Sequence, residues 1–419
     1  MNMVRLIDKK RRGGALTDGE LGDIVRGYTR GDIPDYQMSA FLMAVCLRGM
    51  SAEETVSLTL HMLHSGETLD LSAIAGIKTD KHSTGGIGDK TTLVLVPLVA
   101  ACGGRAAKLS GRGLGFTGGT IDKLEAIPGF QTSLPLSRFV EQVNRIGAAI
   151  AGQMGNLVPA DKRIYALRDV TGTVESLPLI ASSIMSKKLA SGADAVVLDV
   201  KAGSGAFMKT RREAEALAAL MVRIGRDCGK RMDAVITEMD QPLGSAVGNA
   251  LEVQEALELL RGGGPADLRE LCLDLAARML VLSELGDYAA CRGLAARTLD
   301  SGGALERFRM LIEAQGGDGE AAENPARLPA ARYRVTIPAK EPGKLTGMDG
   351  AEIGRAAVLL GAGRLRLEER VDPAAGIRVL AKPGDVLECG TPLAELCTNR
   401  EENLRMAERV YRGALRIEE

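Results

Sequence analysis

Aromatic side chains are scarce in this chain of 419 residues, which has no tryptophan, six tyrosines and six phenylalanines. Few aromatics disfavour a platform on which the bases of single-stranded nucleic acid could stack. The formal net charge is −1, so no basic surplus is present to attract nucleic acid or an anionic membrane. We therefore expect neither nucleic acid nor a membrane as a partner, and we expect an aliphatic core.

Targeting and redox motifs are also lacking. The seven cysteines form no Cys-x-x-Cys pair, and most lie in apolar patterns typical of helices or strands. Free thiols of this kind indicate a reducing compartment. The N-terminal residues have no apolar stretch of a signal peptide, and no run approaches the roughly 20 apolar residues of a membrane helix. These features predict a cytoplasmic protein.

The pattern of apolar residues predicts several segments with different architectures. Residues 3–65 show helical spacing only, with capping boxes at Thr17-x-x-Glu20 and Ser51-x-x-Glu54. Beyond residue 70, short apolar runs alternate with helical patterns. These runs lie at 77–82, 105–109, 148–153, 195–200 and 234–238. Strands that alternate with helices predict a mostly parallel sheet, in which ligands bind at the carboxyl ends of the strands.

We expect an all-α domain beside an α/β domain, with a cleft between them. The small helical domain would consist of residues 1–66 and 156–192, because the second segment is helical again. The large α/β domain would consist of residues 67–155 and 193–330. A C-terminal α+β module would occupy residues 331–419. Its segment 381–392 resembles the hairpin of biotinyl and lipoyl carrier domains, but no modifiable lysine follows at the hairpin tip, so we expect a structural relative only.

Two glycine-rich segments, at 81–89 and 108–125, directly follow expected strands. Glycine lets the backbone turn sharply and approach a ligand closely, and hydroxyl and N–H groups at the start of a helix suit an anion such as phosphate. Hydroxyl groups would donate neutral hydrogen bonds, and lysines charge-assisted ones. The candidate phosphate ligands are Lys81, Ser83, Thr92, Lys108, Ser110 and Thr120. Neither segment has the spacing of a P-loop or of a dinucleotide fold.

Other candidate residues carry different chemistry. His82 lies inside the first glycine-rich segment, where a neutral imidazole could donate to or protonate a leaving group. Its alternative role is that of a structural histidine. Ser183 and Lys187 are four residues apart and share a helix face, while Arg168 ends the preceding helix. Taken alone, these three are more typical of surface residues. A metal pair at residues 61 and 64 lacks a third ligand nearby.

Residues 110–125 resemble the signature of the pyrimidine-nucleoside and thymidine phosphorylase family. Residues 81–86, 165–170 and 182–190 match the family as well, and the resemblance covers essentially the whole chain. It implies the two-domain fold above, a homodimer, and inorganic phosphate as co-substrate with no organic cofactor. The implied reaction is reversible phosphorolysis of uridine, thymidine or deoxyuridine to the free base and α-D-(deoxy)ribose 1-phosphate.

The resemblance also implies roles for individual residues. Phosphate would contact the six candidates named above. The base would contact Arg168, Ser183 and Lys187, with His82 against a base carbonyl, so His82, Arg168 and Lys187 form the catalytic set. A potassium ion is implied as well. Its ligands would be the backbone carbonyls of Gly88, Lys90, Leu243 and Ala246, and the side chain of Glu255.

Two positions depart from the family pattern. Phe116 stands where histidine is usual, and Lys90 stands where a small residue is usual, which puts a cation beside the implied potassium site. Lys108 favours the branch with broad specificity. The alternatives are a thymidine-restricted phosphorylase, an anthranilate-type phosphoribosyltransferase that uses a diphosphorylated sugar and magnesium, and a catalytically silent nucleoside-binding protein. We expect the dimer interface on the helix at 33–49.

Overall fold

The computed structural model describes residues 2–113, 118–364 and 369–418, and the chain forms two compact units. The helical unit consists of Met1–Ala73, Met154–Val196 and Glu215–Ala234. The α/β unit consists of Ile74–Gln153, Val197–Ala214 and Val235–Glu419. This division differs from the expected one in two respects. Residues 215–234 join the helical unit, and the C-terminal residues cluster with the α/β unit instead of forming a third one.

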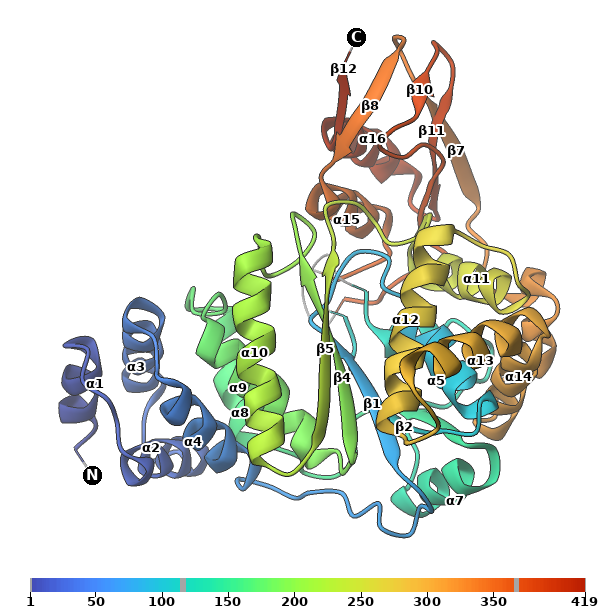
Figure 1. Cartoon of the computed structure of the whole chain (residues 1–419). Coiled ribbons are helices and arrows are strands. Elements are labelled where there is room, and N and C mark those ends of the chain that lie inside the picture. The colour runs from blue at the N-terminus through green and yellow to red at the C-terminus, as the bar shows by residue number, and fades with distance from the viewer. Residues whose placement is uncertain (1, 114–117, 365–368, 419) are drawn as a thin grey trace. The chain divides into compact units, whose positions relative to one another are not determined.

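The helical unit combines helices from distant parts of the chain (Figure 1). Its helices are α1 (Met3–Arg11), α2 (Asp18–Arg30), α3 (Asp35–Arg48), α4 (Ala52–Leu63), α8 (Pro159–Asp169), α9 (Leu177–Ala190) and most of α10 (Arg211–Asp227). Both predicted capping boxes are present, at the start of α2 and of α4. Helix α4 packs on α9, and α2 and α3 pack on α8. The packing confirms that the two predicted helical segments share one core.

A five-stranded sheet with the order β3-β2-β1-β4-β5 forms the centre of the α/β fold (Figure 1). The strands are β1 (Lys78–Ser83), β2 (Arg105–Leu109), β3 (Ala148–Ala151), β4 (Ala195–Ala202) and β5 (Arg231–Glu238). Strand β2 pairs in parallel with β1 on one side and with β3 on the other. The predicted parallel sheet is confirmed, and the carboxyl ends of β1 and β2 lie at the same edge.

Helix α5 (Thr91–Ala101) positions the first glycine-rich segment. Its residues from Thr91 to Ala100 are all buried, as expected for a helix that is apolar on every side. It packs on β2 and, among the later helices, chiefly on α12 (Ala266–Leu282) and α14 (Gly303–Ala314). The remaining helices of this part are α6 (Thr120–Leu124), α7 (Leu136–Ile146), α11 (Asn249–Leu260), α12 (Ala266–Leu282), α13 (Tyr288–Asp300), α14 (Gly303–Ala314), η1 (Gly319–Ala322) and η2 (Pro325–Arg327). Because α5 is buried, it holds the end of the first glycine-rich segment in place.

The C-terminal part is an α+β module, as predicted. It contains β7 (Tyr333–Pro338), β8 (Gly343–Met348), α15 (Gly350–Leu360), β9 (Gly376–Val379), β10 (Val386–Leu387), β11 (Pro392–Thr398), η3 (Glu401–Asn403), α16 (Leu404–Gly413) and β12 (Leu415–Glu418). Strands β9 and β11 flank the carrier-like segment and pair antiparallel. A short strand, β6 (Ala246–Val247), adds to the edge of β9, so the module shares a sheet with the preceding part of the α/β unit.

Among the described residues, no helix is both long and apolar enough to cross a membrane. All seven cysteines are free thiols. Burial raises the pKa of Cys272 to about 12, which makes that thiol unreactive at neutral pH.

Candidate functional site

Both glycine-rich segments leave neighbouring strands at one edge of the parallel sheet. Strand β1 ends at Ser83, and β2 ends one residue before Ser110. The Nζ atom of Lys108, near the end of β2, donates to the backbone carbonyl of Lys81 in β1 over 2.7 Å. Helix α5 begins at Thr91, directly after the loop that follows β1. The fold therefore brings the two segments together within the α/β unit.

Three of the predicted phosphate ligands lie around one gap in the packing that is too small for a water molecule. Lys81, Thr92 and Lys108 share it with Asp80, and all four residues are buried. The Nζ atom of Lys108 lies 3.1 Å from Oδ1 of Asp80. The sequence predicted Lys81 and Lys108 as members of this group, but it did not predict Asp80, whose carboxylate pairs with Lys108.

The ammonium group of Lys81 contacts other side chains of the protein. Its Nζ atom lies 2.9 Å from Asp199 and 3.5 Å from Asp89. It also donates to the hydroxyl of Thr91 over 2.6 Å. The contact with Thr91 is a hydrogen bond, and those with Asp199 and Asp89 are ion pairs. Buried side chains of the protein thus already surround the ammonium group of Lys81.

The carboxylates around Lys81 stay ionised inside the protein. Burial alone raises the pKa of Asp89, but the positive charges of Lys81, Lys201 and Lys123 hold it well below its usual range. Burial also raises the pKa of Asp199, and Lys201 and Lys81 again lower it by more. The Nζ atom of Lys201 lies 2.7 Å from Asp199. The result is a buried network of alternating charges beneath the glycine-rich segments.

The remaining residues of the predicted phosphate set lie in the described part of the α/β unit. His82 is half-buried on β1, and so is the adjacent Ser83, whose hydroxyl accepts the N–H of Gly85 over 3.1 Å. Thr120 is the first residue of α6 and is half-buried. Phe116 lies outside the described residues. The structure thus places His82 and all six predicted phosphate ligands, but says nothing of Phe116.

The predicted base-binding residues gather within the helical unit. Ser183 and Lys187 share one face of α9, and the Nζ atom of Lys187 donates to the hydroxyl of Ser183 over 3.2 Å. The same Nζ atom donates to Oδ2 of Asp161, on α8, over 2.6 Å. The side chain of Lys187 remains 39% exposed, while that of Asp161 is buried. Among the described residues, hydrogen bonds use two of the three ammonium donors of Lys187, which leaves one for a ligand.

Arg168, at the end of α8, is almost completely buried. Its guanidinium donates to the backbone carbonyls of Thr173 (3.0 Å), Val174 (2.7 Å) and Leu179 (3.1 Å). Burial lowers the pKa of Arg168 from its ordinary value of 12.5. In the part of the chain that the structure describes, these bonds use three of its five N–H donors, so two remain. Arg168 consequently holds the turn between α8 and α9 as well as offering donors.

Sequence reasoning missed two further members of this group, Asp161 and Tyr165. The ring of Tyr165 lies below both cations, with its centroid 5.5 Å from the Nζ atom of Lys187 and 5.9 Å from Arg168. Burial raises the pKa of Tyr165, so its hydroxyl stays protonated. Residues 161, 165 and 168 share a helix face by their spacing. That spacing was the signal that could have identified them.

The predicted potassium ligands surround a cation that the chain itself supplies. The Nζ atom of Lys90 donates to the carbonyls of Leu243 and Ala246, each over 2.8 Å, and to the carboxylate of Glu255. Lys90 is completely buried. A potassium ion on the same oxygens would have to occupy the position of this ammonium group. The residues present therefore do not fit the implied ion.

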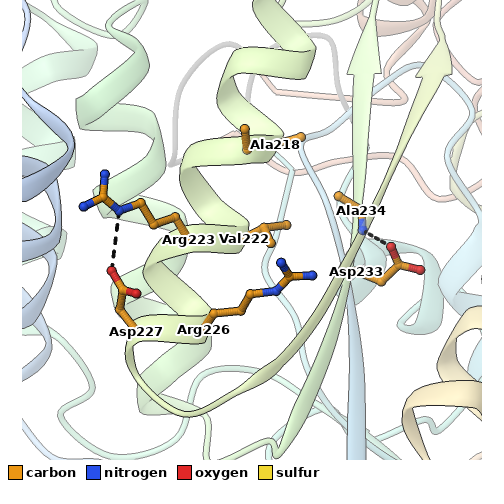
Figure 2. A pocket seen from close by; sticks show the side chains of 8 residues that line it. Ala218, Val222, Arg223, Arg226, Asp227, Asp233 and Ala234 are labelled. Carbon is orange, nitrogen blue, oxygen red and sulfur yellow. Dashed lines mark hydrogen bonds and ion pairs between the residues drawn. The ribbon is translucent and has the colours of Figure 1, made fainter.

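A separate pocket lies on α10 and the start of β5 in the helical unit (Figure 2). It measures about 510 Å³, and its lining includes Arg223, Arg226, Asp227 and Asp233. Figure 2 shows Arg223 turned toward Asp227, with which it forms a 3.6 Å ion pair. The described residues of this pocket include no predicted site residue, so it is not the candidate site.

Comparison with protein families divides the chain into three matching regions. Residues 4–66 match the helical bundle domain of a glycosyl transferase family, and residues 75–305 match the α/β domain of the same family. Residues 344–418 match the pyrimidine nucleoside phosphorylase C-terminal domain. The three regions follow the order of the helical, α/β and C-terminal parts described above.

A solved structure of another kind of enzyme has a similar fold. Anthranilate phosphoribosyltransferase from Thermus thermophilus aligns with a TM-score of 0.59, covering 74% of this chain and 98% of that one. The sequences are only 20% identical, so the similarity concerns the fold alone.

Curated relatives match over nearly the whole length. A pyrimidine-nucleoside phosphorylase from Bacillus subtilis is 55% identical over 98% of this chain and 95% of its own length. Enzymes with the same name from Geobacillus stearothermophilus and Staphylococcus aureus are 52% and 54% identical, over 98% and 96% of this chain and 95% and 93% of their own lengths. With identity at this level from end to end, the chain belongs to the pyrimidine-nucleoside phosphorylase family.

Proposed function

We propose that the protein catalyses the reversible phosphorolysis of pyrimidine nucleosides with inorganic phosphate. The substrates are uridine, thymidine and deoxyuridine, and the products are the free base and α-D-(deoxy)ribose 1-phosphate. The observation that carries the proposal is the 55% identity with the Bacillus subtilis enzyme over 98% of the chain. The protein works as a cytoplasmic homodimer without an organic cofactor.

The residues of the helical unit act on the base. As the glycosidic bond breaks, its electron pair moves to the pyrimidine, and the sugar becomes cationic at C1′. The free donors of Arg168 and Lys187 stabilise the negative charge that develops on the base, with His82 against a base carbonyl. Interactions that strengthen in the transition state lower the barrier, whereas equal binding of substrate does not. Asp161 and Tyr165 hold the two cations in position.

The residues of the α/β unit act on phosphate. The hydroxyls of Ser83, Thr92, Ser110 and Thr120 donate neutral hydrogen bonds to the phosphate oxygens. Lys81 and Lys108 contribute positive charge beneath the two loops, and their carboxylate partners Asp80, Asp89 and Asp199 fix where the ammonium groups lie. A phosphate oxygen then forms the new bond to C1′ as the base leaves, with inversion at that carbon.

The rival activities have weaker support. Similarity to the phosphoribosyltransferase is limited to the fold, since identity is 20%, against 52–55% for the phosphorylases. No group of three or more His, Cys, Asp or Glu residues suited to a metal ion exists in the described part of the chain. A silent nucleoside-binding protein would not need His82, Arg168 and Lys187, all of which are present. We therefore favour the phosphorylase.

The test is an assay of base release by ultraviolet absorbance with uridine, thymidine, deoxyuridine and cytidine. We expect uracil and thymine to appear only when phosphate is present. Release from thymidine alone would indicate the thymidine-restricted phosphorylase. Base release from none of the four, in a folded protein that still binds nucleosides, would contradict the proposal and favour the silent nucleoside-binding protein.

A further inference from the structure

Three oxygens converge on one buried ammonium group at the base of the first glycine-rich segment. The Nζ atom of Lys90 donates to the carbonyls of Leu243 and Ala246 over 2.8 Å each and to Glu255 of α11. These contacts use the three donors of the ammonium group. Because Lys90 is completely buried, water does not compete for them. The ammonium is thus fully coordinated by this chain.

Hydrogen bonds within the protein also fix the position of the Glu255 carboxylate, which accepts from Lys90. The carboxylate of Glu255 accepts the backbone N–H groups of Ser245 (2.8 Å) and Ala246 (3.2 Å). The same short loop therefore binds Glu255 through its N–H groups and Lys90 through its carbonyls. A loop with this arrangement presents oxygens to a cation whether or not the cation is a side chain.

Two glycines leave only the space that a single small cation needs. A Cβ atom on Gly88 would lie 2.8 Å from the Leu243 carbonyl and 3.4 Å from Nζ of Lys90. One on Gly244 would lie 3.1 Å from the same Nζ. Both glycines have positive φ angles, of 72° and 67°. A second cation beside the ammonium would face an unscreened like charge in a buried site.

We infer that the ammonium group of Lys90 replaces a bound monovalent cation, so that the protein needs no potassium. The same oxygens become a potassium site when the lysine side chain is shortened. The cation is tethered to the segment that it organises, because Lys90 directly precedes α5. The ammonium group therefore occupies the cation site fully, whichever salt surrounds the protein.

The tethered cation connects two loops of the α/β unit. One is the loop between β1 and α5, which precedes Thr92. The other is the loop at 243–246, whose Leu243 N–H donates to the carbonyl of Ile87 over 3.0 Å. A second buried lysine supports the arrangement, since Lys123 donates to the Asp89 carbonyl over 2.6 Å and pairs with Glu252. Lys90 is thus a positioning residue, which acts through the loops that it joins.

The first experiment compares the wild-type protein in potassium, sodium and choline chloride at equal ionic strength. We expect the same thermal unfolding midpoint in all three salts, and the same rate of base release. A higher midpoint in potassium than in sodium would overturn the inference. The stability measurement does not depend on the proposed function, so a failure of that function leaves this test intact.

The second experiment uses Lys90→Thr, which empties the space between the oxygens. Its midpoint should fall in sodium and choline and recover in potassium, rising with the logarithm of potassium concentration once binding saturates. A variant with wild-type stability in every salt, or one that potassium does not rescue, would contradict the cation site. Lys90→Met serves as a second variant, because its thioether chain fills the space and should prevent rescue.

The matched control is Lys10→Thr in the helical unit. Lys10 is also buried, and its Nζ atom lies 2.8 Å from Glu54, which likewise accepts two backbone N–H groups. Within the described residues, that ammonium donates to the two carboxylate oxygens of Glu54, over 2.8 and 3.0 Å, and not to a pair of carbonyls. Lys10→Thr should therefore be destabilised equally in all three salts. Rescue of this control by potassium would show a general salt effect and overturn the interpretation of Lys90→Thr.

Discussion

At the scale of single residues, Lys187 and Arg168 of the helical unit differ in how much each contributes to folding and to catalysis. The side chain of Lys187 is 39% exposed, and its Nζ atom forms hydrogen bonds with Asp161 and Ser183. Arg168 is 1% exposed and links three backbone carbonyls. Loss of Lys187 should therefore affect turnover more than folding, whereas loss of Arg168 should affect both.

Lys187→Ala tests this distinction. We expect kcat for base release to fall about 100-fold, since the loss of one well-directed electrostatic donor typically costs 10²–10³ in rate. The thermal midpoint should change little, and Arg168→Ala should lower it clearly. Lys162→Ala, an exposed lysine on α8, is the control for both assays. Near-normal turnover of Lys187→Ala would contradict a role for this lysine in catalysis.

At the scale of elements, helix α4 shows how much of the fold rests on local signals. Its N-cap Ser51 accepts the N–H of Glu54 over 3.1 Å, and Glu54 accepts the N–H of Ser51 over 2.8 Å. The same carboxylate also accepts the N–H of Leu16 and pairs with Lys10. The capping box therefore joins α4 to α1 and to the turn before α2.

Ser51→Ala should lower the free energy of unfolding by about 1 kcal/mol, the usual cost of losing an N-cap hydroxyl. The measurement is urea denaturation followed by circular dichroism. Ser137→Ala, which removes an exposed hydroxyl from the first turn of α7, is the matched control. Equal losses in the two variants would show that the capping bond contributes nothing specific.

Sequence patterns predicted the elements well and their ends less well. Strand β2 has the predicted limits, because a charged residue and a glycine-rich segment bound it. The predicted helical segment 156–192 is interrupted before α9 begins at Leu177, where Arg168 binds the carbonyls of Thr173 and Val174 in the turn. Strand β5 begins at Arg231, whose N–H donates to the Asp194 carbonyl, a contact that spacing alone does not reveal.

The candidate site, too, was predictable from the sequence only in part. Hydroxyls and lysines in glycine-rich segments were predictable, because their chemistry is visible in the local sequence. Their carboxylate partners were not, because Asp199 pairs with Lys81 across 118 positions of the chain. A usable signal existed, since Asp199 and Lys201 interrupt an otherwise apolar strand in which all eight residues are buried. Charges in such a strand need partners, although the sequence does not say which.

At the scale of the whole molecule, the buried charge network predicts how stability responds to acid. The pKa of Asp199 in the folded protein lies below its ordinary value of 3.8. Its contribution to stability is therefore complete above that pH and is lost as the pH falls toward the lower, folded value. The pKa of Lys81 is raised above 10.5, so its contribution persists at neutral pH and is lost only in stronger alkali.

Asp199→Asn should consequently be less stable than the wild type at neutral pH, with a smaller difference in acid. The measurement is urea denaturation at a series of pH values from neutral to below 3.8, the ordinary pKa of the residue. Asp23→Asn, on the exposed face of α2, should follow the wild-type curve. A constant difference between Asp199→Asn and the wild type at every pH would exclude the network as its cause.

Assembly into a dimer is the second prediction at this scale. Helix α3 exposes Tyr36, Met43 and Leu47, at 74%, 38% and 76%. Their spacing places them in one stripe along the helix, which suits a twofold interface. Sedimentation velocity should give twice the mass of one chain, and Leu47→Glu should shift the population toward the monomer. A wild-type protein that sediments as a monomer would refute the dimer, and an intact dimer of Leu47→Glu would place the interface elsewhere.

The three-part composition of the helical unit has a consequence for biosynthesis. Its core needs residues from Met1–Ala73, Met154–Val196 and Glu215–Ala234. During translation, the first four helices must therefore wait until the ribosome has added more than a hundred further residues, with their apolar faces exposed in the meantime. Long-range closure of this kind slows folding and favours aggregation of nascent chains. Production of the protein should accordingly depend on chaperones and on the rate of translation more than its final stability would imply.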